Sequence, residues 1–426
     1  MMTVNPDSGF TFSLRNQVEH LFSMNLRTGR DRFTGFRYAY TCPSPLANPA
    51  QSFWHSCFSS IAAAHFSPDH AIKELATLLA RQDADGFIGH KTTWHARKVS
   101  LTDAWSSIQS RDPIAPRHSA LIHPPMLSQA VERISEITKD KSLPLAFMEP
   151  LDRYHNWIGS NRVDSDGLVV SISPEETANT HSPAFDFELG LTQNNPSGWA
   201  LNSKRYLVDL RNAMSGYDQR QLMVKSAFRA KDVLTNALFI DSLETMSRLH
   251  GSFGADNVAQ AYAEQAKKIT ESMIAHLYSR EGGAFFATTG QSDRRTSALT
   301  IAGLSPLIIS GLPLEIAEGL VDRNLSDGTR FWVRYPLSTV AALDPAFDPR
   351  NHKLTWRGPT SLEANWIIWR GLKRHGFEDL AESLALRSSE LVRKSGMRAF
   401  YNPLNGEGLG LESYSGAAIA LDMYDS

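Results

Sequence analysis

The sequence predicts an all-α protein built from pairs of helices joined by long loops. Three observations support this fold class. Apolar residues recur at helical spacing in several long segments, alternating strand patterns are few and short, and glycines follow several of the apolar segments, where helices commonly end.

The clearest helix is predicted to begin at Pro68. Ser67 has the side chain of an N-cap, and proline is well tolerated at the first helical position because the N–H it lacks would have no partner there. Ile72, Leu75 and Leu78 then recur at helical spacing and predict one buried face.

Further apolar stripes predict helices in the segments that follow along the chain. They are Met126–Ile137, Lys225–Leu249, Val258–Leu277, Leu314–Val321, Glu363–His375 and Asp379–Lys394. The glycines expected just beyond helix ends are Gly251, Gly282, Gly376 and Gly396.

Three intervening segments, Gly89–Pro125, Asp152–Tyr206 and Phe331–Pro359, are predicted to be long loops. They are rich in Trp, His, Pro, Asn and Asp. Long loops in a helical domain are usually functional or disordered, and the aromatic content argues against disorder. We therefore expect these loops to form the walls of a pocket.

Composition excludes several classes of protein. The 426 residues carry 43 Lys+Arg against 45 Asp+Glu, so no basic face is expected and nucleic acid is an improbable partner. No apolar run is long enough to span a membrane, and residues 1–7 show no secretion signal. The two cysteines, Cys42 and Cys57, exclude a disulfide framework. We expect a cytoplasmic protein of unknown oligomeric state, with one domain over residues 1–426 and residues 1–37 packing on it as an N-terminal extension.

Common catalytic and cofactor motifs are absent, and no metal or cofactor is expected. There is no Gly-x-Ser-x-Gly, His-Glu-x-x-His or phosphate loop. The segment 164–167, Asp-Ser-Asp-Gly, resembles part of a calcium loop but lacks the downstream bidentate acid, so an Asx-type turn is favoured.

Several segments, taken together, resemble the glycoside hydrolases of family 63. The similarity is to the short bacterial members that act on glucosyl- or mannosylglycerate, with trehalase more distant. The matching segments are 51–58 (Gln-Ser-Phe-Trp-His-Ser-Cys-Phe), 82–90 with Asp-Gly-Phe-Ile, 123–125 (His-Pro-Pro), 335–349, 356–359 (Trp-Arg-Gly-Pro), 365–366 (Asn-Trp), 401–403 (Tyr-Asn-Pro) and 406–410 (Gly-Glu-Gly-Leu-Gly).

The resemblance implies an (α/α)6 barrel with a funnel-shaped pocket, in which two carboxylates perform inverting hydrolysis. By the same alignment, Thr180 occupies the position of the family's acid and Ala399 that of its base. Neither side chain can exchange a proton near neutral pH, and each lost group is worth ~10²–10⁴ in rate. The matches at 182–183 and 401–403 make an alignment error at both sites improbable.

Other family positions are also substituted. His55 replaces an Asp that contacts sugar hydroxyls, His123 replaces a Gln, and Gly416 replaces a Trp. His181 directly follows Thr180. These histidines could move protons at neutral pH or could simply be packed side chains, and their spacing matches no metal-ligand motif.

The candidate catalytic residues are His55, His181, Glu363 and Glu407. The simplest interpretation of Glu363 is an exposed acid in the first turn of a helix, and that of Glu407 is a structural role in a glycine-rich turn. Candidate substrate-binding residues comprise aromatic side chains of the funnel wall and polar residues beside the substituted positions. They are Phe53, Trp54, Phe58, His123, Glu176, Thr180, Trp356 and Arg357. Some of the aromatic residues could instead pack between helices.

The function expected from the sequence is an enzyme on this barrel that has left ordinary hydrolysis. It would act on a small organic ligand by isomerase, cyclase, lyase or transferase chemistry, in specialised metabolism. Two alternatives stay open: a glycosidase with relocated acid and base residues, and a catalytically inactive sugar-binding protein.

Overall fold

The structure is a computed structural model that describes residues 8–32, 34–94, 101–110, 118–192, 194–326 and 328–425. The first seven residues, and residues 95–100 and 111–117 of the predicted loop Gly89–Pro125, lie outside these ranges.

Helical elements of the described chain form a closed ring, in which each element contacts the next and the last contacts the first. In order they are α2 (Phe53–Ala64), α5 (Leu127–Thr138), α9 (Val233–Ser252), the 3₁₀ helix η4 (Ile301–Ile308), α12 (Leu362–Arg374) and the 3₁₀ helix η5 (Ser415–Ile419).

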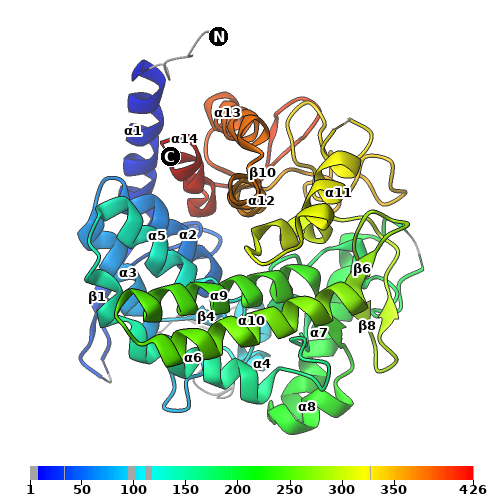
Figure 1. The fold of residues 1–426 in the computed structure, drawn as a ribbon, viewed down its shortest axis with the longest axis horizontal. Helices are drawn as coiled ribbons and strands as arrows, with labels where there is room; N and C mark the ends of the chain where they lie inside the picture. Colours follow the sequence, from blue (N-terminus) through cyan, green and yellow to red (C-terminus); the bar gives the residue numbers. More distant parts are fainter. Residues whose placement is uncertain are drawn as a thin grey trace.

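A second layer of helices packs outside this ring (Figure 1). It contains α3 (Pro68–Leu79) on α2, α6 (Met148–Asn161) on η1 (Leu143–Ala146), which itself contacts α5, α10 (Asp256–Leu277) on α9, α11 (Leu314–Asn324) on η4, α13 (Glu378–Ser395) on α12, and α1 (Ser8–Asn25) with α14 (Ala420–Tyr424) on η5. This is the (α/α)6 barrel that the resemblance implies, and the predicted fold class is confirmed.

Burial distinguishes the two layers. In the inner helix α2 every residue except His55 is buried, which explains why its sequence shows no polar stripe. The outer helix α3 buries a single face that includes Leu75 and Leu78, as its periodicity predicts. His55 is therefore the one residue of α2 that is only partly buried.

Most predicted helices are confirmed to within a few residues. These are α3, α5, α10, α11, α12 and α13. Gly376 and Gly396 have positive φ angles of 78° and 73° just beyond α12 and α13, as helix-terminating glycines should. Gly251 instead lies inside α9, and Gly282 lies in the turn between two short strands.

The prediction of one helix over Lys225–Leu249 is wrong. Helix α8 (Gln219–Lys225) ends at its start, and strand β5 (Ala230–Lys231) interrupts it before α9 begins. The carboxylate of Asp232 caps α9 by accepting a hydrogen bond from the Thr235 N–H at 2.9 Å. This Asp-x-x-Thr pattern marks the start of α9, but it lies inside a longer run of apolar residues and was therefore not recognised as a helix N-terminus.

Two of the predicted loops contain helices. Helix α6 occupies the beginning of Asp152–Tyr206 and α7 (Gly198–Met214) its end, while α4 (Leu101–Ile108) lies within Gly89–Pro125. Their Trp, Asn and His residues weaken the helical pattern. The third loop, Phe331–Pro359, contains neither a helix nor a strand pair.

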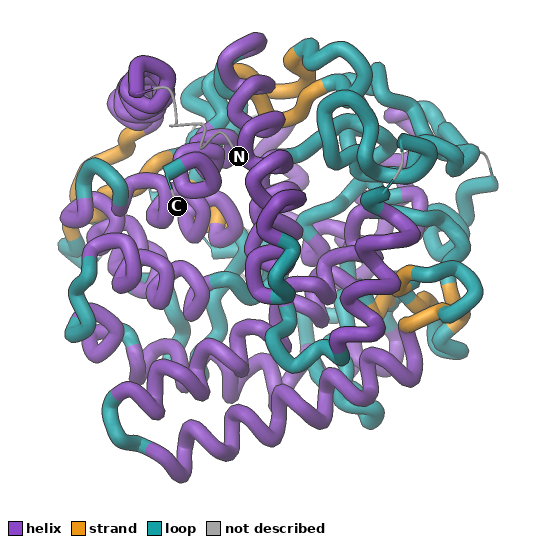
Figure 2. The backbone as a smooth tube through the Cα atoms, turned by 45° about the horizontal axis from the view of Figure 1, so that its top comes forward, coloured by secondary structure: helices purple, strands orange, loops and turns teal. Residues whose placement is uncertain are grey.

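The strands are short (Figure 2), and each pair of them is antiparallel. They pair as β1 (Leu26–Arg30) with β2 (Arg37–Thr41), β3 (Gln51–Ser52) with β4 (Lys91–Thr92), β5 with β8 (Thr288–Thr289) and β8 with β9 (Arg294–Arg295), β6 (Tyr278–Ser279) with β7 (Ala284–Phe285), and β10 (Arg398–Tyr401) with β11 (Gly408–Glu412). Short 3₁₀ turns, η2 (Pro174–Thr177) and η3 (Pro183–Phe185), lie between α6 and α7.

The main hydrophobic cluster includes residues from Leu14 in α1 to Met423 in α14. The single-domain organisation itself stays a prediction. In the described part of the chain, no helix combines the length and the apolar character needed to cross a membrane.

Candidate active site

A cavity of about 840 Å³ opens among the loops at one end of the ring, next to the N-terminal residues of α2 and α12. All three predicted loops contribute to its wall, as expected. The lining residues are Asn48, Ser52, Trp54, His55, His90, Lys91, Trp105, Ser106, Gln109, His123, Glu175, Ala178, Thr180, His181, Arg205, His352, Lys353, Thr355, Trp356, Glu363, Ala399, Phe400, Gly410, Leu411 and Tyr414.

Glu363 is a buried carboxyl group on this wall. Ser361 caps α12 and places Glu363 in its first turn, with a residue exposure of 4%. The interpretation as an exposed first-turn acid is therefore wrong. Burial raises the pKa of Glu363 to about 7, and contacts with Trp54 and Tyr414 counteract only part of that rise. A carboxyl group with this pKa can exist in both protonation states at neutral pH.

Tyr414 joins Glu363 to His55. The Tyr414 hydroxyl donates to Oε2 of Glu363 at 3.1 Å and lies 2.5 Å from Nε2 of His55. Nδ1 of His55 lies 2.8 Å from Oγ of Ser52. Burial lowers the pKa of His55 to about 3, so its ring is neutral at pH 7.

Two further neutral histidines line the same cavity. The rings of His123 and His90 lie 5.1 Å apart between centroids, and His123 also meets Trp54 edge to face. Burial lowers the pKa of His90 to about 3 and that of His123 well below its usual value. Oγ of Ser119 lies 2.5 Å from Nδ1 of His90.

Thr180 and His181 lie on the wall beside Arg205 of α7. The Arg205 guanidinium donates to Nε2 of His181 at 2.7 Å and forms an ion pair with Glu175. Burial, together with the positive charge of Arg205, lowers the pKa of His181 to about 3. His181 therefore accepts a hydrogen bond as a neutral ring, and Glu175 is neutralised by its partner.

Buried Asp209 holds two lining side chains without reaching the cavity itself. Its Oδ2 accepts from the Trp105 indole at 2.7 Å and from the Gln109 amide at 2.8 Å. Burial raises the pKa of Asp209 to about 6. This contact ties the segment after residue 100 to α7.

The structure places the predicted residues in two groups. On the wall of the cavity lie His55, His181, Glu363, Trp54, His123, Thr180 and Trp356, together with Ala399. Outside the described lining lie Phe53, Phe58, Glu176, Arg357 and Glu407.

The second group has structural partners. Phe53 packs against Tyr154, and Phe58 lies between Trp54 and Trp366.

The charged residues of that group either form ion pairs with other residues or lie on the protein surface. Glu176 is fully buried and receives both guanidinium nitrogens of Arg162, at 2.6 and 2.8 Å. Arg357 is paired with Asp186, and Glu407 is exposed on a turn.

Sequence reasoning missed His90, Lys91, Trp105, Gln109, Glu175, Arg205 and Lys353. They share the Trp- and His-rich loops or their flanking helices, but nothing in their spacing separates them from neighbouring residues that face elsewhere.

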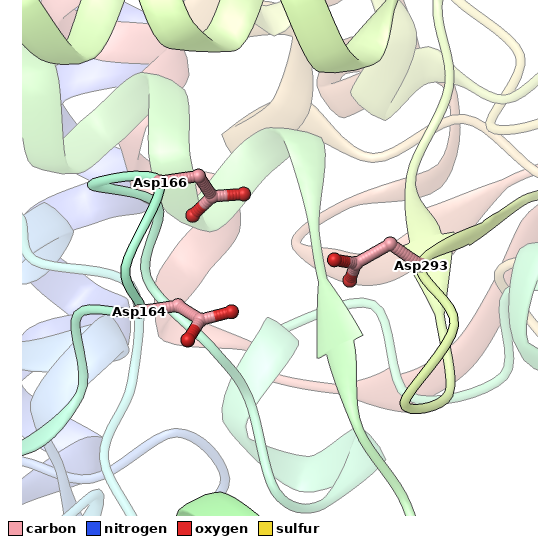
Figure 3. Close-up of side chains that lie close together, drawn as sticks. All are labelled: Asp164, Asp166 and Asp293. Carbon is pink, nitrogen blue, oxygen red and sulfur yellow. The ribbon is translucent and has the colours of Figure 1, made fainter.

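The turn that resembles a calcium loop is occupied by a lysine of the chain. Oxygens of Asp164, Asp166 and Asp293 lie within 4.8 Å of one another (Figure 3). Nζ of Lys231 lies 3.1, 2.5 and 2.7 Å from these three carboxylates. The Leu168 N–H donates to Oδ1 of Asp166, which is the predicted Asx-type turn.

Comparisons with known proteins place the chain in a family. Residues 48–415 match the family model described as the mannosylglycerate hydrolase MGH1-like glycoside hydrolase domain. The mannosylglycerate hydrolase MGH2 of Selaginella moellendorffii is 29% identical over 89% of this chain and 80% of its own. The mannosylglycerate hydrolase of Thermus thermophilus is 27% identical over 90% of this chain and 96% of its own.

Solved structures agree on the fold. The crystal structure of a family 63 mannosylglycerate hydrolase from T. thermophilus in complex with Tris superposes with a TM-score of 0.84, at 23% identity over 97% of this chain and 100% of that chain. The neutral trehalase Nth1 from Saccharomyces cerevisiae gives a TM-score of 0.62 at 16% identity, over 96% of this chain and 79% of that chain.

These findings correct the function expected from the sequence. Isomerase, cyclase, lyase or transferase chemistry is contradicted, because the matching family model and these relatives, at 27–29% identity over most of the chain, are named as hydrolases. The chain belongs to the mannosylglycerate hydrolase MGH1-like glycoside hydrolase family.

Proposed function

We propose that this protein hydrolyses a small glycoside, with Glu363 as the acid that supplies the proton of the leaving oxygen. The observation that carries the proposal is a carboxyl group with a pKa of about 7 on the cavity wall. General-acid catalysis is most efficient when the pKa of the acid lies near the working pH. Glu363 meets that condition.

The other residues that line the cavity are poorer candidates than Glu363 for the general acid. Thr180 and Ala399 both line the cavity, and neither carries a group that titrates near pH 7. Among the described lining residues, the other carboxylate is Glu175, which is paired with Arg205. His55, His90, His123 and His181 on the wall have lowered pKa values and are neutral near pH 7, so none of them is a protonated acid there.

The charge of the cavity favours a substrate with an anionic aglycone such as glycerate. Lys91 and Lys353 contribute positive charge, the charges of Arg205 and Glu175 cancel in their ion pair, and Glu363 is half protonated near pH 7. Trp54, Trp105 and Trp356 supply aromatic faces against which a sugar ring can pack. The named relatives act on mannosylglycerate. A cytoplasmic location remains part of the proposal.

The test is turnover of mannosylglycerate and glucosylglycerate, with trehalose and an aryl glucoside as neutral comparisons. We expect the glycerates to be hydrolysed and Glu363→Gln to lower kcat by ~10²–10⁴-fold. Glu407→Gln is the matched control, because it removes an exposed carboxylate outside the described lining. Sugar binding without turnover, or a Glu363→Gln enzyme as fast as the parent, would contradict the proposal.

A further inference from the structure

Four polar side chains form one continuous chain of hydrogen bonds with both ends on the cavity. The contacts run from Ser52 Oγ to His55 Nδ1 at 2.8 Å, from His55 Nε2 to the Tyr414 hydroxyl at 2.5 Å, and from that hydroxyl to Glu363 Oε2 at 3.1 Å. Ser52, His55, Tyr414 and Glu363 all line the cavity. The path therefore connects two points of one wall through the protein.

The chain has two complete hydrogen-bonding states. When Glu363 is ionised, Tyr414 donates to Oε2, His55 donates from Nε2 to Tyr414, and Ser52 donates to Nδ1. When Oε2 carries a proton, it donates to Tyr414, Tyr414 donates to Nε2, and His55 donates from Nδ1 to Ser52. In each state every bond has one donor and one acceptor, and the ring of His55 is neutral.

We propose that Ser52, His55 and Tyr414 are a proton relay for Glu363, in which each change in the protonation of Glu363 is accompanied by a change of His55 tautomer. The coupling follows from the hydrogen bonds alone. Its use in turnover rests on the proposed glycosidase function.

In turnover the relay carries the proton of Glu363 to the cavity. Ser52 gives its hydroxyl proton to the leaving oxygen as the bond from the anomeric carbon to that oxygen breaks. One proton moves at each contact at the same time, from Nδ1 to Ser52, from Tyr414 to Nε2, and from Oε2 to Tyr414. The attacking water forms the new bond to the anomeric carbon and releases a proton to the solvent in the cavity, and a proton taken up at Ser52 then returns along the same contacts to Oε2.

Mass and charge balance over this cycle. One water is consumed, two hydroxyl groups are formed, and Glu363 and His55 end in the state in which they began. The relay thus brings the proton of a carboxyl group whose Oε1 is buried to a hydroxyl group on the cavity wall.

The surroundings keep His55 out of the charged state. The titratable groups that face it are Tyr414, Glu363 with Oε1 at 3.8 Å from Nε2, and neutral His123. Desolvation disfavours the imidazolium, so a tautomer change costs less than charging the ring.

The decisive experiment is nitrogen-15 NMR of the His55 ring as a function of pH, with Glu363 followed by carbon-13 labelling. The His55 signals are assigned by their loss in His55→Gln. We expect the ring proton on Nδ1 at low pH and on Nε2 at high pH, with the midpoint equal to that of Glu363. A single His55 tautomer while Glu363 titrates, an imidazolium in that range, or no titration of Glu363 between about pH 5 and 9 would overturn the relay.

Two variants distinguish a loss of the coupling between Glu363 and His55 from a general disturbance of the structure. Tyr414→Phe removes the middle hydroxyl and should fix the His55 tautomer while Glu363 still titrates. Tyr262→Phe is the matched control: it removes a phenol hydroxyl that donates to Asp152 at 2.7 Å, away from the described lining, and should leave the coupling intact. If the His55 tautomer changed with pH in the same way in the parent and in Tyr414→Phe, the relay would be overturned.

Steady-state kinetics tests whether the relay operates during turnover. Tyr414→Phe should lower kcat by ~10²-fold with little change in KM and remove the solvent deuterium effect on kcat. An unchanged deuterium effect would overturn the relay step. If no glycoside is turned over, the NMR result still decides the coupling, so failure of the relay and failure of the proposed hydrolysis are distinguishable.

Discussion

A Cβ atom on Gly416 would lie 2.4 Å from Oε1 of Glu363, closer than any side chain allows. The carboxyl group of Glu363 therefore occupies the space that a side chain at residue 416 would fill. The absence of a side chain at residue 416 and the burial of Glu363 belong to one local arrangement.

Gly416→Ala should therefore displace Glu363. The new methyl group would also lie 2.6 Å from Cε1 of Tyr414, so both ends of the Glu363–Tyr414 hydrogen bond would have to move. We expect kcat to fall by ~10²-fold or more, because a misplaced acid loses most of its catalytic effect. Steady-state kinetics on mannosylglycerate measures the change.

Gly159→Ala is the control for this substitution. Gly159 lies in α6, where an added Cβ would meet no atom within 4 Å. Its kinetics should match those of the parent. A Gly416→Ala enzyme with parental kcat would show that Glu363 is not the acid or that its position is unimportant.

Glu363→Gln should make the stability of the protein less dependent on pH. Burial raises the pKa of Glu363 from its ordinary value of 4.5 to about 7, so folding takes up a proton between these values and stability falls as pH rises through them. Above about pH 7 the ionised carboxylate costs about 3 kcal/mol, from 1.36 kcal/mol per pKa unit.

Urea denaturation at several pH values measures this effect. The parent minus Glu363→Gln difference in unfolding free energy should decrease from about pH 4.5 to 7 and then level off. A difference that is constant with pH would mean that the pKa of Glu363 is not raised.

Ala399→Glu should increase hydrolysis. The methyl group of Ala399 lies on the cavity wall opposite Gly410, which has no side chain to obstruct a longer one. A carboxylate there would add the base of an inverting pair, and we expect kcat to rise by ~10²-fold. Ala399→Gln has the same size without a basic oxygen pair, so an equal gain in that variant would exclude base catalysis as the cause.

Lys231→Met should destabilise the fold without changing the cavity. The ammonium group joins Asp164, Asp166 and Asp293. Without it, the three carboxylates drawn in Figure 3 would face one another as like charges. Because all three carboxylates are at least partly exposed, we expect a loss of about 2 kcal/mol in unfolding free energy.

The double variant Lys231→Met/Asp293→Asn removes one of the repelling charges. It should be more stable than Lys231→Met alone, and chemical denaturation of both variants checks this. A double variant less stable than the single one would show that the methionine, and not the unpaired carboxylates, causes the loss.

The sequence predicted the helices whose burial is one-sided. In α3, Leu75 and Leu78 face the core while the opposite face is solvated, and the alternation is visible as a period. Helix α2 of the inner ring is buried nearly all round and shows no such period. No helix was therefore predicted there, and only the resemblance singled out residues 51–58.

The cavity was only partly predictable. Its loops were identifiable from their aromatic content, and His55, His123 and Thr180 were located by alignment with the family. Arg205 and Asp209 lie one turn apart in α7, and only the structure shows that they hold His181 and Trp105. Long-range contacts of this kind leave no local pattern.

Glu363 shows why the burial and the raised pKa of a site residue could not be predicted from the sequence. Its place in the first turn of α12 was correct, but its exposure was not, because Tyr414 and Gly416 come from a segment about fifty residues later. A pKa raised by burial depends on neighbours that the local sequence does not contain.

The most direct test of the central claim is the pH dependence of kcat/KM for mannosylglycerate hydrolysis in the parent and in Glu363→Gln. If protonated Glu363 is the acid, the parental kcat/KM should decline above a pKa of about 7, and Glu363→Gln should be at least ~10²-fold slower and lack that decline. Turnover that persists in Glu363→Gln with the same pH profile would contradict the account.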